Sequence, residues 1–280
     1  MCLRSLFLSI FLLVPSLLST IQAQDLHVSS FNIRYDNPKD GLDRWDLRKK
    51  DLCTYIGYQS PAILGLQEVT HSQLQHLLAA LKEYNYVGVG RDDGNTAGEY
   101  SPILYKRTRF ELRQSGTFWL SEKPDQVSTG WDAALPRICT YALLFDKKHQ
   151  KPIWVFNTHF DHIGTEARRR SAQLIIQRLN DQSLNQDALI LMGDFNAESE
   201  DPPLRDLLNY FEDPWISAPS KIGPESTFNG FKLMVNNGKR LDYVFHKNLS
   251  LVKYRHSDSR RPNGRQLSDH MAVEAFYDFK

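Results

Sequence analysis

Short apolar runs alternate with amphipathic stretches along the chain after residue 25. The apolar runs are rich in β-branched and aromatic residues, a composition that is typical of buried strands. The predicted strands are Leu26–Ile33, Ala62–Leu66, Ile103–Tyr105, Thr117–Leu120, Ile138–Phe145, Ile153–Asn157, Ala188–Met192, Leu241–Phe245 and Met271–Phe279.

The amphipathic stretches predict helices. In Ser72–Tyr84, leucines recur at i, i+3, i+4 and i+7, which places them on one face of a helix. Trp45–Tyr58 is a second helix, and it ends before Pro61 because the residue preceding a proline avoids the helical conformation. A third helix follows Thr165, and Pro203–Tyr210 forms a short fourth one.

The order of these elements predicts the fold class. Strands outnumber helices, and two strands often follow one another without a helix between them. This order favours an α/β protein with two packed sheets flanked by helices over a simple doubly wound sheet. The stretch from residue 25 to residue 280 contains neither a linker nor a repeat, so we predict one domain.

The N-terminus has the pattern of a secretory signal peptide. The apolar stretch Leu6–Leu18 follows the basic Arg4, and Ala23 is a suitable cleavage site. We therefore predict a signal peptide over residues 1–23, a mature domain over residues 24–280, and a secreted or periplasmic location. An uncleaved anchor is the alternative, although the apolar stretch is short for a membrane span.

Composition and charge narrow the classes of function. The chain has 280 residues, of which 41% are hydrophobic and 24% charged, as in ordinary soluble globular proteins. Its net charge of +1 argues against a protein that coats nucleic acid with a broad basic surface. We predict no stable membrane span and no obligate protein partner. Cys53 and Cys139 could pair, but a buried free thiol is at least as well favoured for Cys139, which lies in an apolar run.

Polar residues suited to catalysis occur where predicted strands begin or end. They are Asn32, Glu68, His159, Asp194, Asn196, Asp242, Asp269 and His270. Carboxylate and amide oxygens without a cysteine cluster favour a hard cation such as Mg²⁺ or Mn²⁺. A histidine paired with an aspartate can deprotonate water near neutral pH. Each residue alone has an ordinary structural explanation, but together they indicate hydrolysis of a phosphoester.

These motifs make the sequence recognisable. Phe31-Asn32, Gln67-Glu68, Asn157-Thr158-His159, Gly193-Asp194-Phe195-Asn196, Asp242-Tyr243 and Ser268-Asp269-His270 occur in this order. The chain thereby resembles the endonuclease/exonuclease/phosphatase superfamily, and in particular its small exported bacterial members. The resemblance implies a four-layer α/β sandwich like that of deoxyribonuclease I, with two mixed sheets covered by helices.

The resemblance also implies roles for individual residues. Glu68 would be the principal metal ligand, with Asn32 beside it and Asp269 completing the site. His270 would be the general base, oriented by Asp242. The remaining members of the set are assigned to the scissile phosphate and its charge: Asp194, Asn196 and His159.

Four further residues are candidates for the substrate side of the site. Arg137 offers a fork of donors for a phosphate. Glu99 would either orient His159 or be an ordinary loop acid. Asp161 and His162 directly follow the His159 motif and are expected to line the cleft. The arginine-rich segment from Arg255 to Arg265 is expected to be a flexible polar loop that is either solvent-exposed or gates the substrate.

The reaction class is better defined than the substrate. We expect a nucleic acid, a nucleotide or another small phosphoester to be the substrate. The alternatives are a sphingomyelinase-like or inositol-phosphate hydrolase, and an inactive binding protein with the same fold. The last alternative is weakened because the catalytic positions are all present in the sequence.

Overall fold

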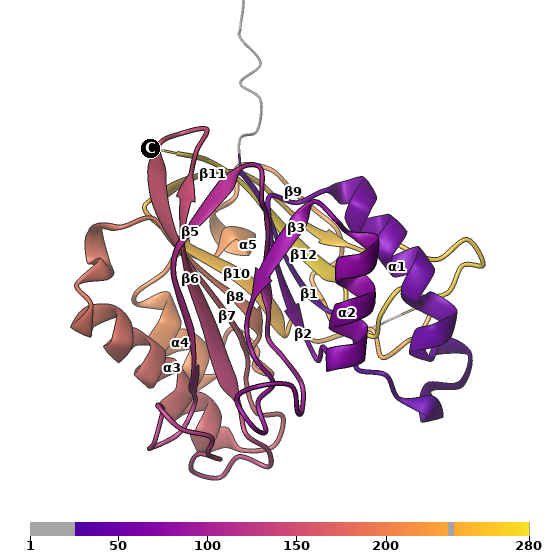
Figure 1. Cartoon of the computed structure of the whole chain (residues 1–280), viewed down its shortest axis with the longest axis horizontal. Coiled ribbons are helices and arrows are strands. Elements are labelled where there is room, and N and C mark those ends of the chain that lie inside the picture. The colour runs from indigo at the N-terminus through magenta and orange to yellow at the C-terminus, as the bar shows by residue number, and fades with distance from the viewer. Residues whose placement is uncertain (1–25, 235–237, 280) are drawn as a thin grey trace, which may run out of the picture.

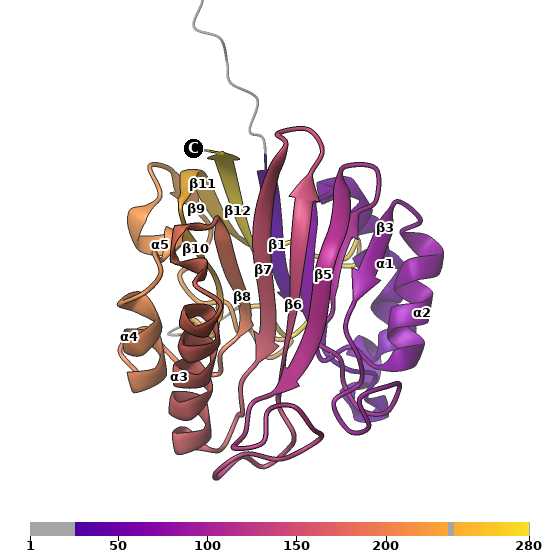
Figure 2. The same ribbon diagram turned by 60° about the vertical axis from the view of Figure 1, so that its left-hand side comes forward.

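Two β-sheets packed face to face form the centre of the protein, and helices cover the outer face of each sheet (Figures 1 and 2). This computed structural model describes residues 26–234 and 238–279, so the predicted signal peptide lies outside the described residues. The arrangement confirms the predicted four-layer α/β sandwich. No helix in the described part of the chain is long and apolar enough to cross a membrane.

The first sheet has seven strands in the order β3-β4-β2-β1-β12-β11-β9. Its central strands β1 and β2 run parallel, while β12 runs antiparallel to β1. The strands of this sheet are β1 (Leu26–Asn32), β2 (Ile63–Gln67), β3 (Tyr84–Val87), β4 (Ile103–Lys106), β9 (Lys221–Ile222), β11 (Leu249–Ser257) and β12 (Ala272–Phe279).

The second sheet has five strands in the order β10-β8-β7-β6-β5. Strands β7 and β8 are parallel neighbours, and the remaining pairs are antiparallel. Its strands are β5 (Phe110–Trp119), β6 (Ile138–Asp146), β7 (Lys151–His159), β8 (Leu189–Asp194) and β10 (Asp242–Lys247).

Helices α1 (Trp45–Gln59) and α2 (His71–Ala80) lie outside the first sheet, and α3 (Thr165–Asp181) and α4 (Pro202–Leu208) lie outside the second (Figure 2). The short α5 (Pro214–Ser217) packs near β10 and β11. The 3-10 turns η1 (Pro38–Asp43) and η2 (Leu184–Gln186) complete the elements.

Three apolar clusters hold these layers together, one between the sheets and one beneath each pair of helices. The sheets approach closely where β2 carries Gly65. A Cβ atom there would lie 2.6 Å from Met192 Cε and 2.9 Å from the Asn157 side chain. Any larger residue at Gly65 would therefore push the two sheets apart. Cys53 and Cys139 are both buried and free.

Several predicted elements differ from those observed. The helix predicted over Ser72–Tyr84 ends at Ala80, because Tyr84 begins strand β3 at the edge of the first sheet. Strand β5 begins at Phe110, well before the predicted start at Thr117. Strand β3 and the first part of β5 have exposed polar positions. Their hydrophobic pattern is therefore weak, although both form the hydrogen bonds of a sheet.

The polar loop predicted from Arg255 to Arg265 begins later than expected, because strand β11 extends to Ser257 before the loop follows. Arg255 lies in strand β11, where its Nε donates to the buried Glu274 on β12. Arg261 and Arg265 both bind Asp43. Each of these arginines has a carboxylate partner more than a dozen residues away in the sequence, and such pairing cannot be seen in a local pattern.

The strand register brings the chemically active residues to one edge of the sandwich. Asn32 pairs with Gln67 at the ends of β1 and β2. Asp194 at the end of β8 pairs with His159 on β7 and with Asp242 on β10. Because β12 runs antiparallel to β1, the residues that precede it reach the same edge, which is opposite the C-terminus in Figure 1.

Candidate active site

A cleft of about 400 Å³ opens at this edge of the sandwich. Most of the predicted site residues line it: Glu68, Glu99, Arg137, His159, His162, Asp194, Asn196, Asp269 and His270. Three others, Asn32, Asp161 and Asp242, are buried and do not line the cleft. The structure thus brings together residues from both sheets, and it places part of the predicted set behind the cleft surface.

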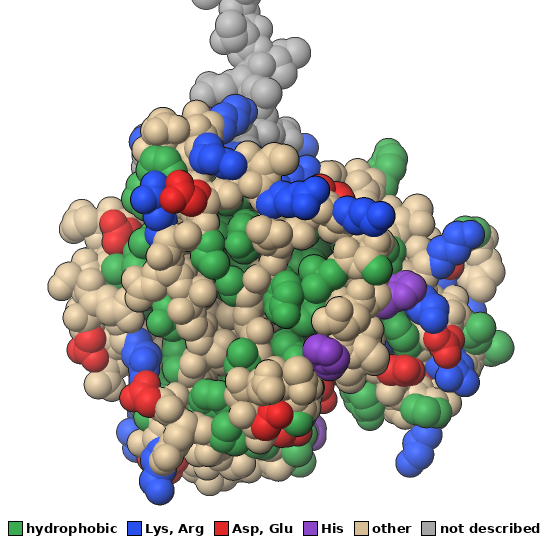
Figure 3. Space-filling model, in the orientation of Figure 1, with side chains coloured by type: hydrophobic (Ala, Val, Ile, Leu, Met, Phe, Trp, Pro, Cys, Tyr) green, Lys and Arg blue, Asp and Glu red, His purple; other side chains and the backbone are tan. Residues whose placement is uncertain are grey.

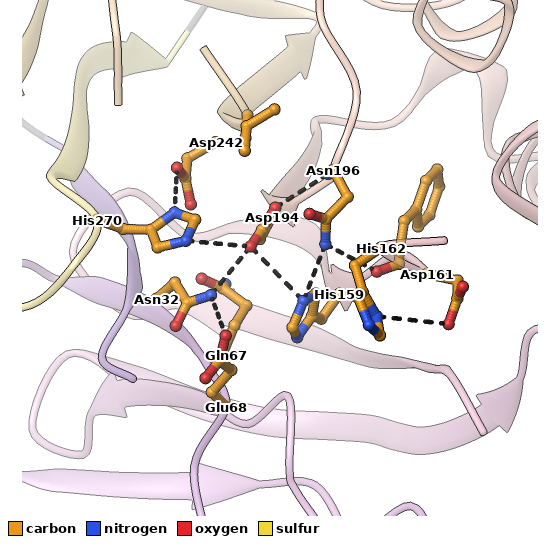
Figure 4. A network of polar contacts seen from close by, with 12 residues as sticks. Asn32, Gln67, Glu68, His159, Asp161, His162, Asp194, Asn196, Asp242 and His270 are labelled. Atoms are coloured by element: carbon orange, nitrogen blue, oxygen red, sulfur yellow. Dashed lines mark hydrogen bonds and ion pairs between the residues drawn. The ribbon is translucent and has the colours of Figure 1, made fainter. Parts of the chain in front are cut away.

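His270 and Asp242 form a buried pair. His270 Nδ1 lies 2.8 Å from Asp242 Oδ2, which fixes the ring and leaves Nε2 facing the cleft. Nε2 lies 3.7 Å from Asp194 Oδ2 (Figure 4). Thr227 supports this pair from behind, because its hydroxyl accepts hydrogen bonds from the backbone N–H groups of Leu241 and Asp242. This geometry suits a general base whose second ring nitrogen is held by a carboxylate.

Asp194 is the centre of the polar network in Figure 4. Its Oδ2 atom accepts a hydrogen bond from Asn32 Nδ2 at 2.9 Å and lies 3.5 Å from His159 Nε2. Its Oδ1 atom accepts from the backbone N–H of Asn196 at 2.9 Å. Asp194 therefore connects β1 of the first sheet with β7 and the loop that follows β8 in the second.

The backbone around the site adopts conformations that are uncommon for L-residues. Gly193 has φ of 151°, and a Cβ atom there would lie 2.1 Å from the carbonyl oxygen of Thr158, so only glycine fits. Glu68 and Asn196 have positive φ values of 59° and 45°. Non-glycine residues in this region are rare and concentrate at functional sites. The local fold thus bends the chain to direct the side chains of Glu68 and Asn196 into the cleft.

His159 and Asn196 lie on the other side of Asp194. The Nδ2 atom of Asn196 donates to the carbonyl oxygen of Phe160 at 3.1 Å and lies 3.1 Å from His159 Nε2. Burial, assisted by the charges of Arg137 and Arg91, lowers the pKa of His159 well below 6.5. His159 is therefore neutral at neutral pH.

The opposite shift applies to His270. Burial alone would lower its pKa, but the charges of Asp242 and Asp194 and the hydrogen bond to Asp242 raise the pKa well above 6.5. Burial raises the pKa of the Asp194 carboxyl, an effect that His270 opposes and Asp242 increases. The pKa of Asp269 is likewise raised by burial, and Glu68 adds to the rise against the opposing charge of His270. Burial therefore disfavours the charged form of these two carboxyls, whereas Asp242 and Asp194 favour the charged form of His270.

Glu68 and Asp269 form the end of the cleft where carboxylates are most concentrated. Asn32 Nδ2 donates to Glu68 Oε1 at 3.0 Å, and the Glu68 Oε2 atom accepts from the backbone N–H of Tyr35 at 3.2 Å. Arg34 lies between the two acids, 3.7 Å from Glu68 and 3.8 Å from Asp269. Asn32 thus presents its amide nitrogen to the carboxylates, whereas metal coordination would require its oxygen.

Two adjoining groups of side chains, in and directly behind the cleft, fit a divalent cation. Asp194, Asp242 and His270 offer ligand atoms that lie within 4.8 Å of one another, and all three residues are buried. Glu68 and Asp269 supply further carboxylate oxygens beside them, and Asp242 Oδ1 is buried without a hydrogen-bond partner among the described residues. Hard cations bind to sets of oxygen ligands of this kind, and their charge would offset the excess of carboxylates.

Arg137, Glu99 and His162 also line the cleft, and the Glu99 carboxylate interacts with the charge of Glu68. Arg137 Nε donates to Asp161 at 3.2 Å, and Arg137 Nη2 lies 2.9 Å from His162 Nδ1. The Asp161 carboxylate also accepts from the backbone N–H groups of Ile163 and Gly164. Asp161 therefore fixes Arg137 and the loop after β7, and the expectation that it lines the cleft is wrong because these bonds hold it in the interior.

The Glu99 side chain points its two oxygens toward Arg91. The Arg91 guanidinium donates to both, at 2.8 and 3.1 Å. This pair is the contact that the structure gives Glu99, and the alternative in which Glu99 orients His159 finds no hydrogen bond among the described residues. The cleft lining still includes the Glu99 side chain.

Sequence reasoning missed several residues of the cleft. Arg34, Tyr35, Leu135 and Phe228 line it, and Arg91 lies directly behind Glu99. Arg34 follows the Asn32 motif by only two residues, so the motif was a usable signal. Phe228 lies in the polar segment that precedes β10, and its ring packs edge-on against His270 with centroids 4.9 Å apart. An isolated aromatic residue between polar neighbours and a glycine was the one clue to its position.

Comparison with known proteins gives consistent results. The model of the Endonuclease/Exonuclease/phosphatase family matches residues 29–270. A crystal structure of an endonuclease/exonuclease/phosphatase from Bacteroides vulgatus is 37% identical, with a TM-score of 0.87, and the similarity covers 91% of this chain and 99% of that one. A mannosyl-6-phosphatase from Bacteroides thetaiotaomicron is 33% identical, with a TM-score of 0.86, and the similarity covers 91% and 100% of the two chains.

A more distant relative is an uncharacterized protein, L388, of Acanthamoeba polyphaga mimivirus. It is 28% identical over 164 residues, and the match covers 56% of this chain. The matched part is 61% of that protein, so this chain spans less than two thirds of its length. The family match, in contrast, extends over the described strand ends from which the cleft is built.

Proposed function

The chain belongs to the endonuclease/exonuclease/phosphatase family, and on this premise we propose that it hydrolyses phosphoesters with a divalent metal ion, Mg²⁺ or Mn²⁺. The observation that carries the proposal is the buried His270–Asp242 pair, 2.8 Å apart, beside Asp194 at the carboxylate-rich end of the cleft. A binding protein would not need a histidine whose one ring nitrogen is fixed while the other faces Asp194.

The proposed reaction breaks the bond between phosphorus and the ester oxygen and forms one between phosphorus and the oxygen of water. With a cation bound to offset the carboxylates that raise its pKa, His270 would be neutral and would take a proton from the water at Nε2, because Asp242 holds Nδ1. Asp194 and Asn196 position the water and the phosphate. His159 hydrogen-bonds a phosphoryl oxygen as negative charge grows there.

Glu68 and Asp269 are the residues proposed to hold the metal ion, and Asn32 would orient the Glu68 carboxylate through the hydrogen bond from its amide nitrogen. When bound there, Mg²⁺ or Mn²⁺ would polarise a phosphoryl oxygen and offset its developing charge. Arg34 lies between Glu68 and Asp269, and it supplies a positive charge at the same end of the cleft. The ion and Arg34 together would balance a cluster in which burial already raises the pKa of Asp269 and Asp194.

A small phosphoester is the substrate that the cleft supports best. Its volume of about 400 Å³ lies within the range of pockets for small molecules. On the face shown in Figure 3, basic side chains occur singly or in small groups with acidic side chains between them, which does not favour wrapping of a long polyanion. The 33% identity to a mannosyl-6-phosphatase supports phosphatase activity over nuclease activity.

We further propose that the protein is exported and that residues 1–23 are removed. The apolar N-terminal stretch after Arg4 supports this. Mass spectrometry of the protein recovered from the periplasm or medium of a bacterial host would test it. A mature chain that begins at Gln24 is the expected result, and an intact N-terminus on a membrane-associated protein would contradict the proposal.

A substrate panel tests the proposed activity. Wild-type protein and the variant His270→Ala would be assayed with Mg²⁺, with Mn²⁺ and with EDTA. The panel contains p-nitrophenyl phosphate, a hexose 6-phosphate, bis-p-nitrophenyl phosphate, single-stranded DNA, sphingomyelin and an inositol polyphosphate. We expect hydrolysis of the monoesters that requires metal and His270.

The other outcomes identify the alternatives. Preferential release of nucleotides would indicate a nuclease. Release of phosphocholine would indicate a sphingomyelinase-like hydrolase, and release of phosphate from the inositol ester would indicate an inositol-phosphate hydrolase. Activity that persists in EDTA would contradict the metal requirement. A folded protein that is inactive on the whole panel would support a binding protein.

A further inference from the structure

The end of the cleft that contains Glu99, Arg137 and His162 has no part in the reaction just described. We infer that it is a subsite for a polyhydroxylated leaving group, such as the hexose of a hexose phosphate, and that Glu99 determines this specificity. This inference rests on the proposed function, because it concerns the part of the substrate that is released.

The charges at this end are balanced in pairs. Glu99 accepts hydrogen bonds from Arg91 at 2.8 and 3.1 Å, and Arg137 donates to Asp161 at 3.2 Å. Arg91, Arg137 and Asp161 are all buried. The two pairs cancel, so they leave no surplus positive charge for a second phosphate. Glu68 adds a further negative charge close to Glu99, which also disfavours a second phosphate here.

The subsite nevertheless has unused capacity for hydrogen bonds. Arg137 is only 4% exposed and lines the cleft, and its Nη1 atom is buried without a partner among the described residues. A carboxylate can accept about four hydrogen bonds, and Arg91 donates one to each oxygen of Glu99. Donors and acceptors therefore lie side by side, and hydroxyl groups can serve as partners for both.

His162 adds a polar group at the mouth of this end. Its Nδ1 atom lies 2.9 Å from Arg137 Nη2, and its side chain is 49% exposed. The ring is therefore fixed on one side and open to the cleft on the other. It can hydrogen-bond a hydroxyl without the loss of a structural contact.

Apolar side chains form walls between the two ends. Leu135 and Phe228 line the cleft and are 39% and 37% exposed, although both are hydrophobic. Phe228 contacts the His270 ring with a centroid distance of 4.9 Å, so this wall begins at the proposed general base. A sugar ring has C–H groups for such walls and hydroxyl groups for Glu99 and Arg137. A compact polyol therefore fits this combination better than a second anion.

The test compares two phosphomonoesters that differ in their hydroxyl groups. Mannose 6-phosphate and cyclohexylmethyl phosphate both have a six-membered ring and a primary alkyl ester, but the second has no ring hydroxyls. For the wild type, we expect kcat/KM to be at least about tenfold higher for mannose 6-phosphate, because a site built for hydroxyls rejects analogues that lack them.

The variant Glu99→Gln removes the charged acceptor at nearly constant size. We expect the preference for mannose 6-phosphate to fall by about tenfold, mainly through a higher KM, with little change for cyclohexylmethyl phosphate. His162→Ala should lower the same preference by a smaller factor, and the exposure of His162 makes this variant safe for folding. Glu166→Gln, which loses a surface ion pair with Arg170 on α3, is the matched control and should leave the preference unchanged.

Each remaining outcome contradicts a different statement. If Glu99→Gln and His162→Ala lower activity on both esters equally, the residues act on the reaction itself and the subsite is overturned. If the preference is absent in the wild type, or a hexose bisphosphate is hydrolysed with a much lower KM than mannose 6-phosphate, a polyol subsite is also overturned. If the wild type hydrolyses neither ester, the proposed function fails, and the subsite fails with it.

Discussion

Two clusters of buried charge, one at the cleft and one around Asp43, are balanced differently. In the cleft, carboxylates outnumber cationic groups. The acids are Glu68, Asp194 and Asp269 in the cleft and Asp242 directly behind it, and the cationic side chains near them are Arg34 and His270. Burial raises the pKa of Asp194 and Asp269, and the neighbouring carboxylates of Asp242 and Glu68 add to the rise against the opposing charge of His270.

The second cluster is built around one buried carboxylate. Asp43 is buried and binds both Arg261 and Arg265. Arg48 is fully buried beside it and donates to backbone carbonyls, including those of Ile33 and Asp43. These bonds attach η1, α1 and the segment before β12 to one another, and they leave no carboxylate in excess.

The comparison distinguishes the charges around Asp43, which stabilise the fold, from the cleft carboxylates, which we propose bind a cation. Breaking a buried ion pair leaves an uncompensated charge, so residues of the Asp43 cluster should matter for stability. In the cleft, the negative charge of the carboxylates is only partly compensated when no cation is bound. Substitutions there should therefore affect binding and catalysis more than folding.

The largest expected effect is that of His270→Ala in the cleft. Loss of a general base lowers kcat/KM by about 10²–10⁴-fold, while the far-ultraviolet circular dichroism spectrum should stay the same. His71→Ala, on the exposed start of α2, is the control and should keep full activity. Retention of full activity by His270→Ala would remove this residue from the mechanism.

Asp43→Asn should have the next largest effect, and on stability instead of activity. Arg261 and Arg265 would lose their shared carboxylate, so we expect the free energy of unfolding in urea to fall by about 3–5 kcal/mol. Activity per folded molecule should change by less than about twofold, in contrast to the effect at His270. A large loss of activity in a stable Asp43→Asn protein would show that the two clusters are not separate.

Metal binding sharpens the comparison further. Mg²⁺ at about one hundred times its dissociation constant should stabilise the wild type by about 2.7 kcal/mol. Glu68→Gln should lose most of this stabilisation, whereas Asp43→Asn should keep it although it starts from a lower stability. Equal stabilisation of Glu68→Gln and wild type in thermal unfolding experiments would place the ion elsewhere.

The smallest effect concerns pH and a histidine outside both clusters. Burial lowers the pKa of His256 from 6.5 to about 4, although the hydrogen bond to the Pro224 carbonyl opposes the shift. Below pH 6.5, His256 therefore binds a proton in the unfolded chain but not in the folded chain. The free energy of unfolding falls as the pH decreases toward 4. This single group should account for a loss of about 2 kcal/mol at pH 5.

The measurement is urea unfolding of the wild type and His256→Gln at pH 7.5 and pH 5. The glutamine variant should lose less stability between the two pH values, because its side chain does not titrate. An identical pH dependence in both proteins would contradict the lowered pKa of His256.

The sequence was sufficient for the residues at strand ends but not for their partners. Asp194 and His159 could be found because each follows an apolar run that becomes a strand. The contacts of Asp194 with Asn32 and His270 could not be inferred from the pattern, because they cross between two sheets. Such contacts depend on strand order and register, which the resemblance to a known family supplied.

The errors have a common physical origin. Strand β11 was missed because its polar side chains hide the alternating pattern, while Arg255 is neutralised by Glu274 on the neighbouring strand. Asp161 was expected in the cleft because it is close to His159 in sequence, but its hydrogen bonds to the loop N–H groups keep it in the interior. In both cases the environment of a charged side chain is set by residues that the local sequence does not identify.

The most direct test of the central claim is anomalous diffraction from a crystal grown with Mn²⁺. The account predicts one strong manganese peak in the cleft, coordinated by oxygens of Glu68 and Asp269. A peak confined to Asp194, Asp242 and His270 would contradict the assignment of the metal ligands, and the absence of any peak in the cleft would contradict the claim that its excess of carboxylates holds a cation.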